Sequence, residues 1–132
     1  HFHLFKRNRN GFFHLIGIAL NQKGLPVRIF TTNQWVTGEM MVDSKVVVSA
    51  LKMFAVAAKG RMAPVSKWLT AFTQLFYGDM KKLIVERDLK IAVLSQQMGD
   101  LDKALHSKEH HVLTECRIDL LKSISQHLSV VN

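Results

Sequence analysis

The sequence contains little cysteine, little proline and, at its front, no acidic side chain. The single cysteine, Cys116, excludes a disulfide within the chain and favours a reducing compartment or indifference to redox conditions. Proline occurs only twice and there is no low-complexity tract, which excludes a repetitive or linker-like chain. The 132 residues, 48% of them hydrophobic and 21% charged, are instead typical of one folded domain.

No apolar run is long enough to cross a bilayer. The longest candidate, residues 46–58, has thirteen residues and includes Lys52, whereas a membrane span needs about 20. A signal peptide does not fit either. Because the chain begins with His1 rather than Met, we expect a fragment of a longer protein or a processed product. The single cysteine favours a location in the cytoplasm. A membrane anchor in a segment outside this chain stays open as an alternative.

Motifs of the common enzyme classes are absent too. There is no glycine-rich phosphate loop and no Gly-x-Ser-x-Gly elbow, and Cys116 has no visible base to activate its thiol. The seven histidines include His106 and His110 at helical spacing, but no recognised spacing supplies the further ligands of a zinc site. We therefore expect no enzymatic activity, no cofactor and no bound metal.

Positive charge gathers at the front of the chain. The net charge is +8, and the first thirty residues carry five basic side chains and no acid, which favours nucleic acid, an acidic membrane surface or an acidic protein as partner. In "FKRNRNGFF", residues 5–13, bases that neutralise phosphate lie among aromatic rings that stack on nucleobases. In the alternative interpretation the bases form a solvated arm and the aromatic rings belong to a strand core. The residues predicted to bind an anion are Lys6, Arg7, Arg9, Lys23 and Arg28.

The first third of the chain has the pattern of a small antiparallel sheet. Residues 12–20, dense in Phe, Ile and Leu, predict a strand, and the turn residues 21–24 lead into a second strand over 25–32. Pro26 belongs at the start or the edge of that second strand, because proline cannot donate a ladder hydrogen bond. A third, weaker strand is predicted over 34–42.

The pattern becomes helical at Asp43 and Ser44, either of which can cap a helix N-terminus. A helix is predicted from there to Gly60, a residue type that commonly ends helices. Its residues are apolar nearly all round, so we expect this helix to be central and buried. Pro64 suits the first turn of the next helix.

A long helix is predicted from residue 65 to about 107. Gly99 and Asp100 within it could form a tight break between two antiparallel helices. An apolar seven-residue repeat keeps its phase across this glycine, which favours a helix that continues. The polar stretch 107–111 is the predicted turn, and a last helix is predicted over about 108–130. The two would pack as a helical hairpin.

The seven-residue repeat runs through the C-terminal half of the chain. Such a repeat keeps one seam of a helix facing a partner helix. The partner is the last helix of the same chain in one interpretation, a second copy in a homodimer in another, and a different protein in a third. All three bury the same side chains. The predicted interface residues are Ile84, Ile91, Leu94, Met98, Leu101, Leu105 and Val112.

Together these patterns predict a single α+β domain, with a basic, β-rich part over 1–43 and a helical part over 44–132. The helical part is expected to end in a long, coiled-coil-like hairpin. The favoured function is a non-enzymatic protein–protein interaction or oligomerisation module that uses the heptad-patterned helix. Two alternatives stay open: a nucleic-acid-binding protein that uses the basic front, and the cytoplasmic part of a membrane-anchored protein.

Overall fold

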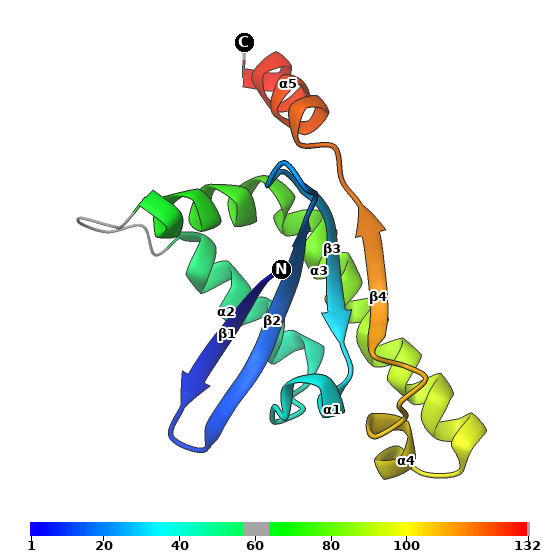
Figure 1. Ribbon diagram of the computed structural model, residues 1–132. Helices are drawn as coiled ribbons and strands as arrows, with labels where there is room; N and C mark the ends of the chain where they lie inside the picture. The colour runs from blue at the N-terminus through cyan, green and yellow to red at the C-terminus, as the bar shows by residue number, and fades with distance from the viewer. Residues whose placement is uncertain (57–63, 132) are drawn as a thin grey trace.

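The computed structural model describes residues 1–56 and 64–131, which form a four-stranded antiparallel sheet with helices on one face (Figure 1). The strands lie in the order β1-β2-β3-β4. Their bounds are β1 Phe2–Asn8, β2 Gly11–Leu20, β3 Pro26–Thr32 and β4 Val112–Arg117. The helices are α1 Gln34–Thr37, α2 Ser44–Val56, α3 Pro64–Met98, α4 Leu101–Leu105 and α5 Leu120–Val131. The predicted α+β class is confirmed.

The predicted hairpin of β2 and β3 is also confirmed. The two strands pair antiparallel, and Pro26 stands at the first position of β3. The sequence pattern did not predict β1. Its residues, which could be interpreted as a solvated arm, pair with β2. In β1 a buried Leu4 is followed by four exposed positions, so alternation is too weak to mark the strand.

The third strand predicted over 34–42 is wrong. Residues 34–37 form the single turn of α1, which Asn33 caps and the left-handed Gly38 (φ +69°) ends. The chain then runs beside the first half of β2, where the amide of Met40 donates to the Phe12 carbonyl (2.9 Å). This backbone hydrogen bond holds the segment after α1 beside β2, although the segment is not a strand.

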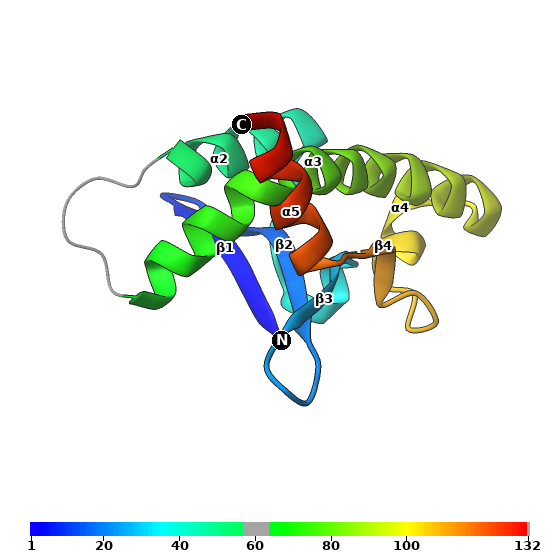
Figure 2. The same cartoon turned by 90° about the horizontal axis from the view of Figure 1, so that it is seen from above.

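α2 and α3 cover one face of the sheet (Figure 2). The main core lies between these layers and includes the fully buried side chains of Ile16, Ile18, Ile29, Val47, Leu51, Met80 and Ile84. Among the described residues, no helix has both the length and the apolar character that crossing a bilayer requires.

α2 begins where the sequence predicts, and the side chain of Asp43 accepts a hydrogen bond from the amide of Lys45 (2.7 Å). Its predicted central burial is wrong. Val47 is enclosed, but Val46 and Met53 are 48% and 67% exposed, because α2 packs against α3 and the sheet with one side only. The predicted end at Gly60 lies outside the described residues. Pro64 opens α3 as predicted.

α3 ends at Met98, so the prediction that the helix continues through Gly99 is wrong. Gly99 has a φ of +89°, the left-handed conformation that commonly ends helices. Asp100 then caps α4, its side chain accepting from the amide of Lys103 (2.7 Å). The apolar repeat continues past the end of α3 because Leu101 and Leu105 belong to α4, whose Ala104 packs against Leu94 of α3.

The predicted helical hairpin is wrong, because residues 112–117 form β4 and not a helix. β4 pairs antiparallel with β3 at the edge of the sheet, and Leu120–Val131 is the part of the predicted last helix that is helical, as α5. In "VLTECR" a buried Leu113 is followed by alternating half-buried and exposed positions, which is the period of a strand. The predicted partner of the long helix in a coiled-coil-like hairpin is therefore missing, and α3 packs against α2 instead.

Candidate functional site

A groove of about 570 Å³ opens between α3, α4 and the segment that precedes α2. Its polar lining residues are Asp88, Ser95 and Gln96. The remaining lining residues are apolar and are Met41, Val42, Ile91, Ala92, Leu101 and Leu105. A largely apolar concavity with a few polar groups is the usual form of a binding site, so this groove is the candidate functional site.

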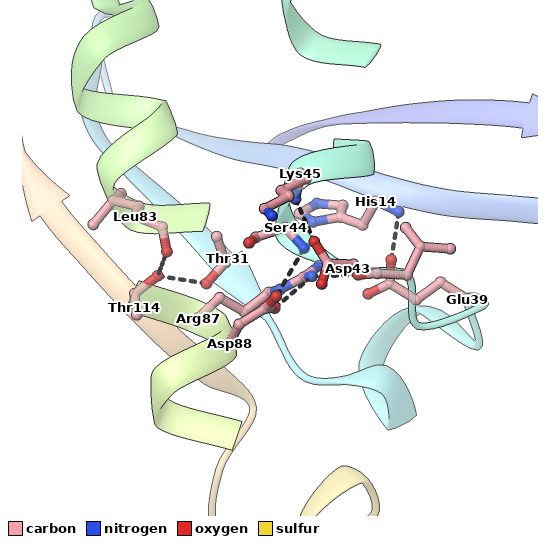
Figure 3. Close-up of polar contacts among 11 residues, drawn as sticks. His14, Thr31, Glu39, Asp43, Ser44, Lys45, Leu83, Arg87, Asp88 and Thr114 are labelled. Carbon is pink, nitrogen blue, oxygen red and sulfur yellow. Dashed lines mark hydrogen bonds and ion pairs between the residues drawn. The ribbon is translucent and has the colours of Figure 1, made fainter. Parts of the chain in front are cut away.

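Arg87 and Asp88 hold one wall of the groove in place (Figure 3). The Arg87 side chain is 3% exposed, and its Nη2 donates to the Val42 carbonyl (2.6 Å) and to Asp88 Oδ1 (2.7 Å). Asp88 Oδ2 accepts a hydrogen bond from the amide of Ser44 (2.7 Å), the first residue of α2. These bonds attach the segment 41–44 to α3. Because Arg87 neutralises Asp88, the groove offers no unpaired charge at this wall.

Asn33 holds the opposite wall, which α4 forms. Its side chain is fully buried, and Nδ2 donates to the carbonyls of Ala104 (2.9 Å) and His110 (3.0 Å). The end of β3 is thereby connected to α4 and to the loop that follows α4. The positions of Leu101 and Leu105 in the groove depend on these long-range hydrogen bonds.

Two buried titratable side chains, His14 of β2 and Glu39, lie near Arg87 and Asp88 (Figure 3). Glu39 Oε2 accepts a hydrogen bond from the backbone amide of His14, as a carbonyl of a neighbouring strand would. Its other oxygen, Oε1, has no hydrogen-bond partner within the described part of the chain. Burial raises the pKa of Glu39 to about 7, although that hydrogen bond and the charge of Arg87 act in the opposite direction. This carboxyl therefore titrates near neutral pH.

His14 is neutral in the folded protein. Burial lowers the pKa of His14 to about 3, and the nearby His3 and Arg87 act in the same direction. The pKa of His3 is lowered too, again chiefly by burial. His3 Nδ1 and His14 Nε2 lie 3.0 Å apart, so one imidazole donates and the other accepts. Among residues 1–56 and 64–131, no three His, Cys, Asp or Glu side chains are placed to hold a metal ion.

Six of the seven predicted heptad residues lie either in the packed interior or in the groove. Ile84 is fully buried in the main core, and Leu94 packs with Ala104 and Leu113 in a second, smaller cluster. Val112 begins β4, half-buried and paired with β3. These side chains are covered by the chain itself.

Ile91, Leu101 and Leu105 are the heptad residues that line the groove. Leu101 is 53% exposed, and Ile91 is half-buried. Met98 is 36% exposed but does not line the groove. Three of the predicted interface residues therefore share one concave surface.

The five basic residues do not form one patch. Lys23 lies in the turn between β2 and β3, at the far end of β2 from the β1–β2 turn (Figure 1). Arg28 forms an ion pair with Glu115 of the neighbouring β4. The residues that the structure does bring together, at the tip of the β1–β2 hairpin, are Lys6, Arg7 and Arg9.

Sequence reasoning missed the polar residues that build the groove. Asn33 and Asp88 match no motif, and their partners Ala104 and Ser44 are distant along the chain. The buried Glu39, outside the groove lining, was missed for the same reason. Arg87 could have been recognised from the sequence, because it occupies a heptad position where an apolar residue is expected. A buried arginine requires a partner, and here that partner is the groove wall.

Cys116 lies on β4 and not in a helix as predicted. The thiol is half-buried, and burial, followed by the charges of Asp79 and Glu86, raises its pKa. A thiol of this kind stays protonated at neutral pH and is a poor nucleophile.

These features define a class of protein: an α+β domain whose antiparallel sheet carries helices on one face, with an apolar groove between α3, α4 and the segment that precedes α2. The chain belongs to the family described as Domain of unknown function (DUF6969), whose model matches residues 1–118. The match includes all four strands and every residue that lines the groove, and α5 follows it. No curated protein and no solved structure is significantly similar to the chain.

Proposed function

We propose that the chain is a non-enzymatic protein-interaction module whose groove binds the apolar face of an amphipathic helix. The observation that carries the proposal is the convergence of Ile91, Leu101 and Leu105 on one open groove. A contiguous apolar concavity that faces water is typical of a protein- or ligand-binding surface. Folding leaves Leu101 53% exposed, so a partner that covers it gains the corresponding hydrophobic free energy.

A helix suits this groove better than an extended peptide or a charged ligand. Two walls of the groove are helices, and apolar helices pack by inserting side chains three and four residues apart into such grooves. An extended peptide gains affinity by adding to a sheet edge, and no strand residue is among the described residues that line the groove. A charged ligand would find Asp88 already paired with Arg87.

The proposal is tested by titrating the full chain with a synthetic helical peptide that carries leucines at its first, fourth and eighth positions. Binding is followed by NMR through the methyl groups of Ile91, Leu101 and Leu105, which should shift saturably. Leu101→Asp should weaken binding at least about ten-fold, because burying one leucine contributes about 1.5–3 kcal/mol and a carboxylate resists desolvation.

Gln97→Asp is the matched control, since it adds the same charge to an exposed position of α3 outside the groove lining. It should bind the peptide as the wild type does. Circular dichroism checks each fold. If Leu101→Asp loses helix, Ala92→Glu, which blocks the groove from an exposed position, takes its place. The absence of saturable shifts, or equal binding by the wild type and the blocked variant, would contradict the proposal.

A second proposed function uses the tip of the β1–β2 hairpin. The hairpin residues there include three bases and no acid, and the neighbouring Phe5 is 44% exposed, with its ring centroid 5.5 Å from that of Phe12. Bases that neutralise phosphate beside an exposed aromatic ring are the components of a single-strand binding surface. These bases are Lys6, Arg7 and Arg9.

Fluorescence anisotropy with a random single-stranded oligonucleotide tests this second function. The affinity should fall steeply as salt rises, and each neutralised base should reduce the slope of log K against log salt by about 0.7. Lys122→Gln, a charge change on the exposed surface of α5, should leave the slope unchanged. No detectable binding at low salt would remove this function.

We also propose a cytoplasmic location, with a membrane anchor in a segment outside this chain as the alternative. The lone cysteine and the basic front suit a reducing compartment with anionic partners. The full-length gene tests the alternative, since an anchored protein must encode about 20 consecutive apolar residues in a further segment.

A further inference from the structure

α5 carries an apolar stripe that the rest of its chain leaves exposed. Leu121, Ile124 and Leu128 are 77%, 40% and 54% exposed, and their spacing of three and four residues places them on one face of the helix. In Figure 1 α5 extends away from the sheet at the end of the molecule opposite α4. The stripe has the pattern that a helix-binding groove recognises.

The charges of α5 suit the groove as well. The helix has no acidic residue, and its one lysine, Lys122, projects from the side away from the stripe. The residues that flank the stripe, Ser125 and His127, are small or weakly basic. A neutral stripe therefore matches a groove in which Arg87 already neutralises the acid.

α5 does not lie in the groove of its own chain. β4 begins on the side of α4 and extends for six residues before the chain reaches α5 (Figure 1). A strand of this length covers about 20 Å. The linker between β4 and α5 is Ile118 and Asp119, and it leads α5 onward from the end of β4 and away from α4 (Figure 1). A groove and a stripe at opposite ends of one molecule can meet only between two molecules.

We propose that the groove binds α5 of a second copy, and that two copies exchange these helices about a two-fold axis. This inference rests on the helix-binding function proposed above and names its partner. Reciprocal exchange covers both stripes and both grooves at once and closes the assembly. One-way docking would leave a stripe and a groove open at each end and would extend into chains.

The test measures the molar mass of the full chain in solution by light scattering. The wild type should have twice the 15.0 kDa mass of one chain. Leu128→Asp, which disables the stripe, and Leu101→Asp, which disables the groove, should each reduce the mass to that of a monomer. Gln126→Asp on the polar side of α5 and Gln97→Asp on α3 are the matched controls and should remain dimers.

Mixing the two monomeric variants distinguishes helix exchange from other dimers. The mixture retains one intact stripe and one intact groove, so at concentrations where the wild type is fully dimeric a mixed dimer should form. The double variant should stay monomeric. Leu121→Asp and Ala92→Glu replace the first pair if either fails the circular dichroism check.

Three outcomes would overturn the exchange. A monomeric wild type would do so, and if the synthetic leucine peptide still binds, the groove has another partner and the proposed function stands. If the peptide fails as well, both ideas fail. A wild-type dimer whose variants do not complement one another, or do not dissociate, would show a different interface.

Discussion

Glu39 and His14 should give the stability of this protein two opposing dependences on pH. The pKa of Glu39 is raised from 4.5 to about 7 in the folded state, so folding becomes less favourable as pH rises through this window. The pKa of His14 is lowered from 6.5 to about 3, so folding becomes less favourable as pH falls below 6.5. Between pH 4.5 and 6.5 the two dependences cancel.

The magnitudes follow from the two shifts. One pKa unit corresponds to 1.36 kcal/mol, so ionising Glu39 above pH 7 lowers the free energy of unfolding by about 3 kcal/mol relative to pH 4.5. Protonating His14 lowers it by about 5 kcal/mol between pH 6.5 and pH 3. Both side chains are 2% exposed, so solvent screens these effects little.

Single substitutions separate the two contributions. Glu39→Gln keeps an oxygen that accepts the His14 amide hydrogen bond but does not titrate, and His14→Phe keeps the ring contact with Phe5 without a charge. Urea unfolding of all three proteins from pH 4.5 to 7.5 provides the assay. Relative to the wild type, Glu39→Gln should gain about 3 kcal/mol over that range as pH rises, because it lacks the carboxyl that ionises.

His14→Phe should change in the opposite way relative to the wild type, gaining about 3 kcal/mol as pH falls from 6.5 to 4.5, because it has no imidazole to protonate on unfolding. A stability difference from the wild type that stays constant with pH in either variant would refute the reasoning. It would show that the group has the same pKa in the folded and unfolded chains.

Three further predictions concern packing, the groove wall and the thiol. Gly17→Ala should lower the free energy of unfolding by about 1–3 kcal/mol in a thermal assay, because the added Cβ would lie 2.5 Å from the Phe30 ring. Gly78→Ala, whose Cβ meets no described atom within 4 Å, should instead stabilise α3 by about 1 kcal/mol. Equal effects of the two substitutions would count against the packing argument. Arg87→Met should cost about 3 kcal/mol in urea unfolding and should also abolish peptide binding, because the Val42 carbonyl and Asp88 lose their partner; unchanged binding would show that the wall stands without it. Cys116 should react with iodoacetamide at pH 8 more slowly than free cysteine, and urea should restore the rate; equal rates in folded protein and free cysteine would exclude the raised pKa.

Local sequence was sufficient for the elements whose signals lie within a few residues of one another. Dense apolar residues and the turn 21–24 mark the β2–β3 hairpin, and Pro26 stands where a residue without an amide proton is tolerated. Asp43 and Pro64 mark the starts of α2 and α3 through hydrogen bonds and torsion angles that a single helical turn determines. The helical character of α5 is likewise visible in the sequence, because its apolar residues recur every three or four positions.

The residues of β4 and the break at Gly99 required contacts that no local pattern contains. Val112–Arg117 becomes a strand because β3 offers it a free edge, and Thr31 Oγ1 and Thr114 Oγ1 lie 2.6 Å apart although 83 positions separate them in sequence. The heptad repeat is real, but α3, α4 and β4 share its side chains, which one continuous helix would otherwise carry.

The groove, too, depends on contacts between residues that are distant in the sequence. Arg87 binds the Val42 carbonyl across 45 positions, and Asn33 binds the Ala104 carbonyl across 71. Helix caps and turns are decided by neighbours within a few residues, so a sequence displays them directly. A sheet edge or a groove wall forms only when distant segments exclude water from a shared surface, and its residues acquire their roles from that surface.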